Sequence, residues 1–138
     1  MRMQQHIAQV TGPSAAVVCV LLPAFGGPAQ QQRSRAREVM SAGQTYAVFQ
    51  DGQPIAAAVF REAGGITVLE AVAVSPAARG QGLGRQLVEY LAGLQETPRP
   101  IRLETDDDAV GFYRALGFKV QALPERWPGV RRYACELA

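Results

Sequence analysis

The order of the predicted strands and helices indicates a mixed α/β fold, with a central sheet covered by helices on both faces. Strand-like runs bounded by Gly, Pro and Asp recur along the chain, and amphipathic helical runs separate several of them. One strand–helix–strand unit implies a parallel pair joined by a right-handed crossover. With 138 residues and 48% hydrophobic composition the chain can bury one core, so residues 1–138 are predicted to form a single domain.

The first strand is predicted at residues 15–22, because Val17, Val18 and Val20 favour extended structure and Pro23 ends the run. The residues before it carry no periodic pattern. The apolar stretch at residues 15–25 also fits the central region of a signal peptide. Gly12-Pro13 interrupts the approach to it and no A-x-A site follows, so a strand is the preferred interpretation.

One helix is predicted after this strand, at residues 30–42. Its apolar stripe is thin, and Gly43 is expected as the C′ residue that follows the helix end. Its arginines, Arg33, Arg35 and Arg37, are expected on a solvated face, and contact with an acidic substrate is the alternative.

The remaining elements alternate between strands and helices. A hairpin with Asp51-Gly52 at its turn is followed by a second turn at Gly64-Gly65, which makes three strands antiparallel neighbours. The predicted strands are residues 45–49, 55–60, 67–74, 101–104, 118–123 and 131–137, and the predicted helices are residues 83–95 and 109–116.

A glycine-rich loop between the strand at 67–74 and the helix at 83–95 carries most of the functional information. Glycines at the N-terminus of a helix leave backbone N–H groups open to an anion, and the helix dipole favours negative charge there. No Lys follows as in a phosphate-binding P-loop, and the dinucleotide pattern G-x-G-x-x-G fails because Arg85 stands at its last position. The pattern that fits is R-x-x-G-x-G, formed by Arg79, Gly82 and Gly84.

This loop resembles the acyl-CoA pyrophosphate loop of the GNAT superfamily of N-acetyltransferases. Residues 106–118, DDDAVGFYRALGF, are similar to the N-x-x-A-x-x-x-Y-x-x-x-G-F segment of the same family, and the two motifs stand in the family order. The resemblance covers residues 67–118 and implies a GNAT-like acyl-CoA N-acyltransferase fold. In that fold the parallel pair splays apart and the pantetheine arm of acetyl-CoA lies in the gap.

The resemblance also assigns the residues that bind acetyl-CoA. The arm is expected to pair with strand backbone, and the loop with its flanking arginines is expected to hold the pyrophosphate by charge-assisted hydrogen bonds. Asp106 replaces the usual Asn of the family motif. The expected set is Val72, Ala73, Val74, Arg79, Gly80, Gln81, Gly82, Leu83, Gly84, Arg85, Asp106 and Tyr113.

Two residues are predicted to be catalytic. Tyr113 matches the tyrosine of the family motif and is expected to protonate or stabilise the departing CoA thiolate. Glu70, a carboxylate among apolar residues and on one strand face with Val72 and Val74, is expected to have a raised pKa and to take the proton of the amine. An ion pair of Glu70 with Arg61 is the alternative, and Glu104 is the second candidate for the base.

The predicted function is therefore transfer of an acetyl group from acetyl-CoA to a primary amine by direct attack in a ternary complex. A small-molecule acceptor is preferred over a protein, with the loop at residues 124–132 and its Trp127 as a possible wall of the acceptor site. The alternatives are a non-catalytic acyl-CoA-binding regulatory module and a peptide- or protein-binding domain with a vestigial loop. The acceptor itself is not identified by the sequence.

Composition and charge also limit which other partners are expected. A net charge of +2 is too small to argue for nucleic acid, and no apolar run is long enough to span a membrane, so a cytoplasmic protein is expected. Cys19 and Cys135 are predicted to be buried thiols, and the adjacent carboxylates at 106–108 are expected to cap a helix rather than bind a metal. His6 is expected to be exposed, and the apolar tail at residues 133–137 is a possible homodimer interface.

Overall fold

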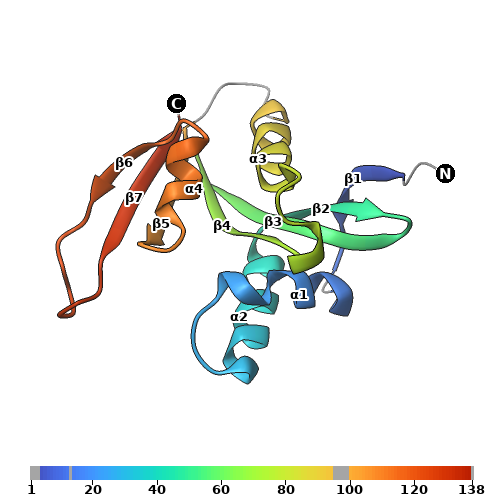
Figure 1. Ribbon diagram of the computed structural model, residues 1–138, viewed down its shortest axis with the longest axis horizontal. Coiled ribbons are helices and arrows are strands. Elements are labelled where there is room, and N and C mark those ends of the chain that lie inside the picture. The colour runs from blue at the N-terminus through green and yellow to red at the C-terminus, as the bar shows by residue number, and fades with distance from the viewer. Residues whose placement is uncertain (1–3, 13, 95–99, 138) are drawn as a thin grey trace. The chain divides into compact units, whose positions relative to one another are not determined.

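The computed structural model describes residues 4–12, 14–94 and 100–137 as a mixed α/β structure (Figure 1). The strands are β1 (Gln5–Val10), β2 (Gln44–Gln50), β3 (Gln53–Ala63), β4 (Ile66–Val74), β5 (Ile101–Asp106), β6 (Lys119–Ala122) and β7 (Arg132–Leu137). The helices are α1 (Ala15–Leu21), α2 (Ala29–Ala42), α3 (Leu83–Gly93) and α4 (Val110–Ala115), with short 3-10 turns η1 (Leu22–Ala24) and η2 (Pro76–Ala78). None of the helices in these ranges is long and apolar enough to cross a membrane.

The strands form a seven-stranded sheet with the order β1-β2-β3-β4-β5-β7-β6. β1, β2 and β3 pair antiparallel, whereas β4 and β5 pair in parallel through Thr67 with Ile101 and Val68 with Arg102. The predicted hairpin is confirmed, with positive φ at Asp51 (51°) and Gly52 (81°) in its turn. The mixed α/β class with a parallel crossover pair is also confirmed.

Two compact units divide the described chain. The first contains the residues up to Arg61 together with Leu69–Leu94, and the second contains Glu62–Val68 together with the residues from 100 onward. The glycine-rich loop therefore belongs to the first unit, and the second family-like segment belongs to the second unit.

The predicted first strand at residues 15–22 is wrong, because Ala15–Leu21 is helix α1. Ser14 precedes it as N-cap, and its Oγ accepts a hydrogen bond from the backbone N–H of Val17 (3.4 Å). The first strand is instead β1, in the stretch that carries no clear pattern. Two helices thus lie between β1 and β2, where the sequence had predicted only one.

Helix α2 agrees with the predicted helix, but Gly43 acts differently from the prediction. It is the C-cap residue itself, with an extended backbone (φ −128°, ψ −160°) and an N–H that bonds the carbonyl of Val39. A Cβ at this position would lie 2.4 Å from the carbonyl oxygen of Phe60. Close approach of the α2 end to β3, rather than a left-handed turn, requires the glycine.

Within the first unit, helices cover both faces of the strands (Figure 1). Ala47 and its partner Ala57 face α1 and α2, where they join a buried cluster with Val17, Leu21 and other residues. The residues next to them in each strand point to the opposite face. On that face the ring centroids of Tyr46 and of Tyr90 in α3 lie 5.5 Å apart.

β3 lies at the centre of these layers. Ala56, Ala57 and Ala58 are each 0% exposed, so small side chains are buried on both faces in succession. The layers above and below this strand can therefore approach closely.

In the second unit, β7 pairs antiparallel with both β5 and β6. The tail predicted as an interface strand is therefore interior to the sheet, with its backbone paired on both sides. Cys135 in β7 is buried as predicted, and burial raises the pKa of its thiol. Cys19 in α1 is exposed, which corrects the prediction of two buried thiols.

Candidate functional site

The glycine-rich loop begins where β4 ends. The backbone N–H of Ser75 donates to the carbonyl of Ile55 (2.8 Å), and η2 follows directly. Gly80 and Gly82 both have left-handed backbones, with φ of 85° and 76°. Gly82 is the N-cap of α3 and makes no side-chain capping bond. The helix therefore begins with a backbone conformation that only glycine adopts at low cost.

This start leaves the first turn of α3 suited to an anion. The first N–H groups of an α-helix have no intrahelical acceptor, and their partial positive charge adds to that of the helix dipole. The first intrahelical bond here runs from the N–H of Gln86 to the carbonyl of Gly82 (3.0 Å). A Cβ built on Gly80 or Gly82 would meet no protein atom within 4 Å, so the space in front of the loop is open.

Helix α3 is held in place by its apolar side. Leu83 and Gly84 in its first turn are buried, and so are three further residues of the same face, Leu87, Val88 and Leu91. The exposed residues Tyr90 and Leu94 extend the predicted apolar stripe beyond the core. Gln95, the predicted end of this helix, lies outside the described residues.

The two arginines that flank the loop lie in different settings. The Nε of Arg79 donates to the carbonyl of Val74 at the end of β4 (3.3 Å), so this side chain braces the loop against the strand. Arg85, in the first turn of α3, lies 3.8 Å from Glu89 one turn further on. Because both members of that pair are exposed, it contributes about 0.3–0.5 kcal/mol at most.

Glu70 lies on β4 in the same unit as the loop. Alternate residues of this strand are buried, so Glu70, Val72 and Val74 share the other, half-buried face as predicted. The structure pairs Glu70 with Arg61, whose Nε donates to Oε1 of Glu70. The carboxylate side chain is 26% exposed, so the ion pair is partly open to water.

Tyr113 lies in α4 of the second unit and is buried. Its ring makes edge contacts with Phe112 (5.0 Å between centroids) and Phe118 (5.5 Å). Burial is the main cause that raises the pKa of the Tyr113 phenol above its ordinary value, and the negative charges of Cys135 and Asp106 add to it. The hydroxyl is therefore protonated throughout the neutral range and is available as a hydrogen-bond donor.

Asp106 precedes α4 and has a structural partner. Its Oδ1 accepts hydrogen bonds from the backbone N–H groups of Asp108 and Ala109, both at 3.0 Å. It thus orders the turn that leads into the helix, whereas the N-cap position itself is Ala109, without a side-chain cap. Asp107 accepts a hydrogen bond from the hydroxyl of Tyr133 (2.5 Å).

The other residues singled out in the second unit lie on its surface. Glu104 of β5 is exposed, and Trp127 in the loop before β7 is 61% exposed. Across residues 4–12, 14–94 and 100–137, no group of three or more His, Cys, Asp or Glu side chains is arranged to hold a metal ion.

The structure adds one contact at the loop that the sequence analysis missed. Nε2 of Gln5 in β1 lies 2.8 Å from Oε1 of Gln50 and 3.4 Å from Oε1 of Gln81, the central residue of the loop. No sequence pattern predicts this contact, because the strand that carries Gln5 has no clear alternation.

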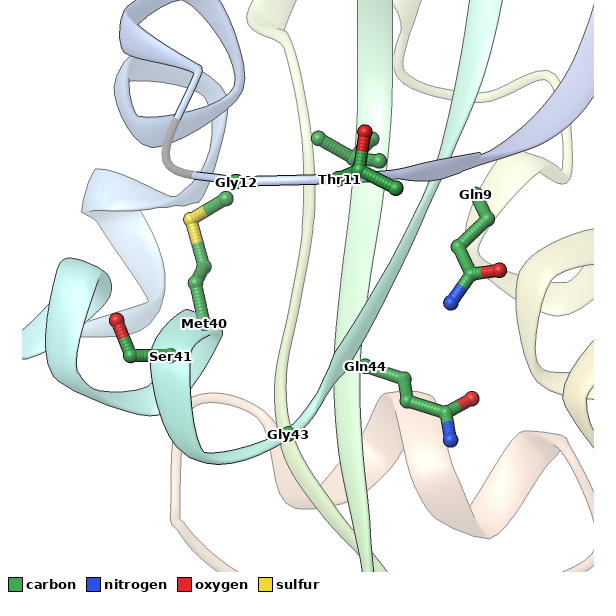
Figure 2. A pocket seen from close by; sticks show the side chains of 8 residues that line it. Gln9, Thr11, Gly12, Met40, Ser41, Gly43 and Gln44 are labelled. Atoms are coloured by element: carbon green, nitrogen blue, oxygen red, sulfur yellow. The ribbon is translucent and has the colours of Figure 1, made fainter.

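A separate pocket of about 420 Å³ lies in the first unit, at the far end of β1 from Gln5. Its walls are the end of β1 with the residues that follow it, and the end of α2 with the residues that join it to β2. Figure 2 shows Met40 pointing toward Gly12 on one side of the pocket, and Gln9 and Gln44 on the other side. β1 spans about 17 Å at ~3.4 Å per residue, so this pocket is distinct from the glycine-rich loop.

A mixed sheet with one parallel pair, and a strand that leads through a glycine loop into a helix, define an acyl-CoA N-acyltransferase fold. Residues 41–120 match the acetyltransferase (GNAT) domain family, which is more than half of the chain. The chain belongs to the GNAT family.

Similar proteins agree with this assignment. The peptidyl-lysine N-acetyltransferase YjaB of Salmonella typhimurium is 39% identical over 57 residues, which cover 41% of this chain and 39% of that protein. The match thus spans about two-fifths of the length of this curated relative.

Two solved structures share the fold. The ribosomal-protein-S18-alanine N-acetyltransferase of Escherichia coli superposes with a TM-score of 0.74 at 20% identity, over 97% of this chain and 93% of that one. A GNAT family acetyltransferase from Elizabethkingia anophelis, with acetyl-CoA bound, has a TM-score of 0.73 at 16% identity, over 96% and 97% of the two chains.

Proposed function

We propose that this protein is an N-acetyltransferase that transfers an acetyl group from acetyl-CoA to a primary amine. The observation that carries the proposal is the start of α3 on left-handed Gly82 without a side-chain cap, inside a chain of the GNAT family. This feature leaves backbone N–H groups for the pyrophosphate of acetyl-CoA.

The binding residues follow from the loop. The N–H groups from Gly80 to Arg85 would hold the pyrophosphate, and Arg79 would keep the loop in place through the Val74 carbonyl. The backbone of Val72, Ala73 and Val74 would pair with the pantetheine arm. The carbonyl of Val74 already accepts one bond from Arg79, so only its second lone pair is open to a ligand.

The amine acceptor has to lose a proton before it attacks, because an alkylammonium has a pKa near ~10.4. Glu70 would take this proton, directly or through a water molecule, with Arg61 fixing the carboxylate. The amine nitrogen then forms a bond to the carbonyl carbon of the thioester, the bond from that carbon to sulfur breaks, and the nitrogen loses its second proton to solvent water as the amide forms. The products are an N-acetyl amine and the CoA thiolate.

Tyr113 would assist the departure of the thiolate. Because its phenol has a raised pKa, a thiolate does not remove its proton, and the hydroxyl instead donates a hydrogen bond to the sulfur. This role requires a protonated phenol and no covalent acetyl-enzyme. Asp106 would act on the position of α4 through the turn that it orders, rather than by contact with acetyl-CoA.

The first experiment combines acetyl-CoA binding with an acetylation assay on a panel of amines. The panel contains small alkylamines and lysine peptides, since both present a primary amine and the Salmonella relative is named for peptidyl-lysine. A small-molecule acceptor is expected to be the better substrate. If acetyl-CoA binds but no amine is acetylated, a non-catalytic acyl-CoA-binding module is favoured. If acetyl-CoA does not bind, the proposal is wrong.

Replacement of Tyr113 by Phe tests the catalytic assignment. We expect kcat to fall by about 100-fold while the Kd for acetyl-CoA changes by less than about threefold, because the hydroxyl acts on the leaving sulfur. Tyr46→Phe is the matched control, since Tyr46 is also a buried tyrosine but lies in β2, outside both family motifs in the sequence. An unchanged kcat in Tyr113→Phe would exclude the assigned role.

A further inference from the structure

The glycine-rich loop has an intrinsic weakness that its ligand would have to overcome. Gly80 and Gly82 have more backbone freedom than any other residue type, so ordering the loop on binding costs conformational entropy. Contacts that hold the loop before the ligand arrives reduce this cost and strengthen binding.

At its base the loop is held by Arg79, and at its centre by Gln81. Gln81 lies in the open part of the loop, between the two left-handed glycines. Its carboxamide oxygen lies 3.4 Å from Nε2 of Gln5, which also lies 2.8 Å from Oε1 of Gln50. The Nε2 group carries two N–H donors, so Gln5 can donate to Gln50 and to Gln81 at the same time.

The position of Gln5 is itself fixed by the hairpin between β2 and β3. The N–H of Asp51 donates to the carbonyl of Gln4 (3.1 Å), and the N–H of Gln4 lies 3.4 Å from Oδ1 of Asp51. Gln5 and Gln50 are direct partners in the ladder of β1 and β2, so their side chains lie on the same face. The edge strand β1 therefore presents Gln5 to the loop from a backbone that is already ordered.

We propose that Gln5 is a positioning residue for acetyl-CoA binding, which orders the Gly80–Gly82 loop through Gln81. The inference rests on the proposed function for its ligand, but the contact itself does not. Gln5 acts through the loop and does not touch the reacting atoms.

The test measures acetyl-CoA affinity, turnover and loop order in Gln5→Ala. The bond to Gln81 is exposed and contributes about 0.5–1.5 kcal/mol, so its loss is expected to raise Kd about two- to tenfold, with kcat at saturation unchanged. NMR relaxation without ligand should show lower backbone N–H order parameters at Gly80 and Gly82 than in the native protein. Gln9→Ala is the matched control, because Gln9 is exposed on the same face of β1.

A double-mutant cycle separates this role from a general effect on β1. If Gln5 acts through Gln81, the double variant Gln5→Ala/Gln81→Ala binds acetyl-CoA no more weakly than Gln81→Ala alone. Fully additive losses, or equal losses in Gln9→Ala, would overturn the proposal. If the native protein binds no acetyl-CoA, the proposed function fails, and the N–H order parameters of the loop alone then decide whether Gln5 orders it.

Discussion

Replacing Gly82 by Ala tests the glycine-rich loop most directly. At φ 76° an alanine costs about 1–2 kcal/mol, because its Cβ meets the backbone in the left-handed region. Unfolding entropy of ~2.1 cal/mol/K per residue over 138 residues gives about 0.3 kcal/mol/K, so Tm should fall by about 3–7 °C. No protein atom lies within 4 Å of the added Cβ, so any further effect falls on the ligand.

The assay is thermal unfolding with and without acetyl-CoA. At 100 times Kd the ligand should stabilise the native protein by about 2.7 kcal/mol, a Tm increase of about 9 °C. If the Cβ weakens binding 100-fold, the same concentration gives only about 0.4 kcal/mol, close to 1 °C.

Gly65→Ala is the control for this experiment. Gly65 has a φ of 81° and nothing within 4 Å of its Cβ position, but it lies in the turn before β4. Gly65→Ala should lose as much stability as Gly82→Ala, but acetyl-CoA should still raise its Tm by the full amount. If acetyl-CoA raises the Tm of Gly82→Ala as much as that of the native protein, the anion-binding role of the loop is refuted.

Three further outcomes are expected. Gly43→Ala should lose about 1–3 kcal/mol in thermal unfolding, because its Cβ would lie 2.4 Å from the Phe60 carbonyl, while acetyl-CoA still binds; unchanged stability would contradict the packing argument. Arg79→Ala should raise the Kd of acetyl-CoA about two- to tenfold by calorimetry through loss of the bond to the Val74 carbonyl, and Arg79→Lys should not restore it. In an ultraviolet titration two tyrosines, Tyr113 and Tyr133, should ionise at a higher pH than an ordinary phenol, and Tyr113→Phe should remove the signal of one of them. Because the folded-state pKa of Tyr113 is raised, its contribution to stability is complete below pH 10.0 and declines as the pH rises further.

Sequence reasoning was most accurate where local chemistry and tertiary structure agree. The turns at Asp51-Gly52 and Gly64-Gly65 need positive φ, and both occur where they were predicted. The helix that follows Gly82 has a strong apolar side, and its start was predicted correctly. The ion pair of Glu70 with Arg61 was an open alternative, because strand spacing alone does not determine which side chains meet across two strands.

The N-terminal part was predicted wrongly for a physical reason. Valines at 17, 18 and 20 favour a strand in isolation, but burial against β2 and β3 outweighs their weak propensity and stabilises α1. Ser14 as N-cap was the available signal. β1 was not predicted, because an edge strand with exposed Gln and His residues lacks the alternation of polar and apolar residues that identifies a half-buried strand.

The three buried alanines of β3 limit how this protein can change over evolution or in the laboratory. From Ala56, Ala57 or Ala58, which are 0% exposed, nearly every substitution adds volume that the neighbouring buried layer must accommodate. The one smaller residue, glycine, would weaken the strand. β3 also supplies the Ile55 carbonyl that holds Ser75 at the entrance to the glycine-rich loop, so displaced layers would disturb the loop as well. Libraries that seek new acceptors should therefore keep β3 constant and vary the surface around it.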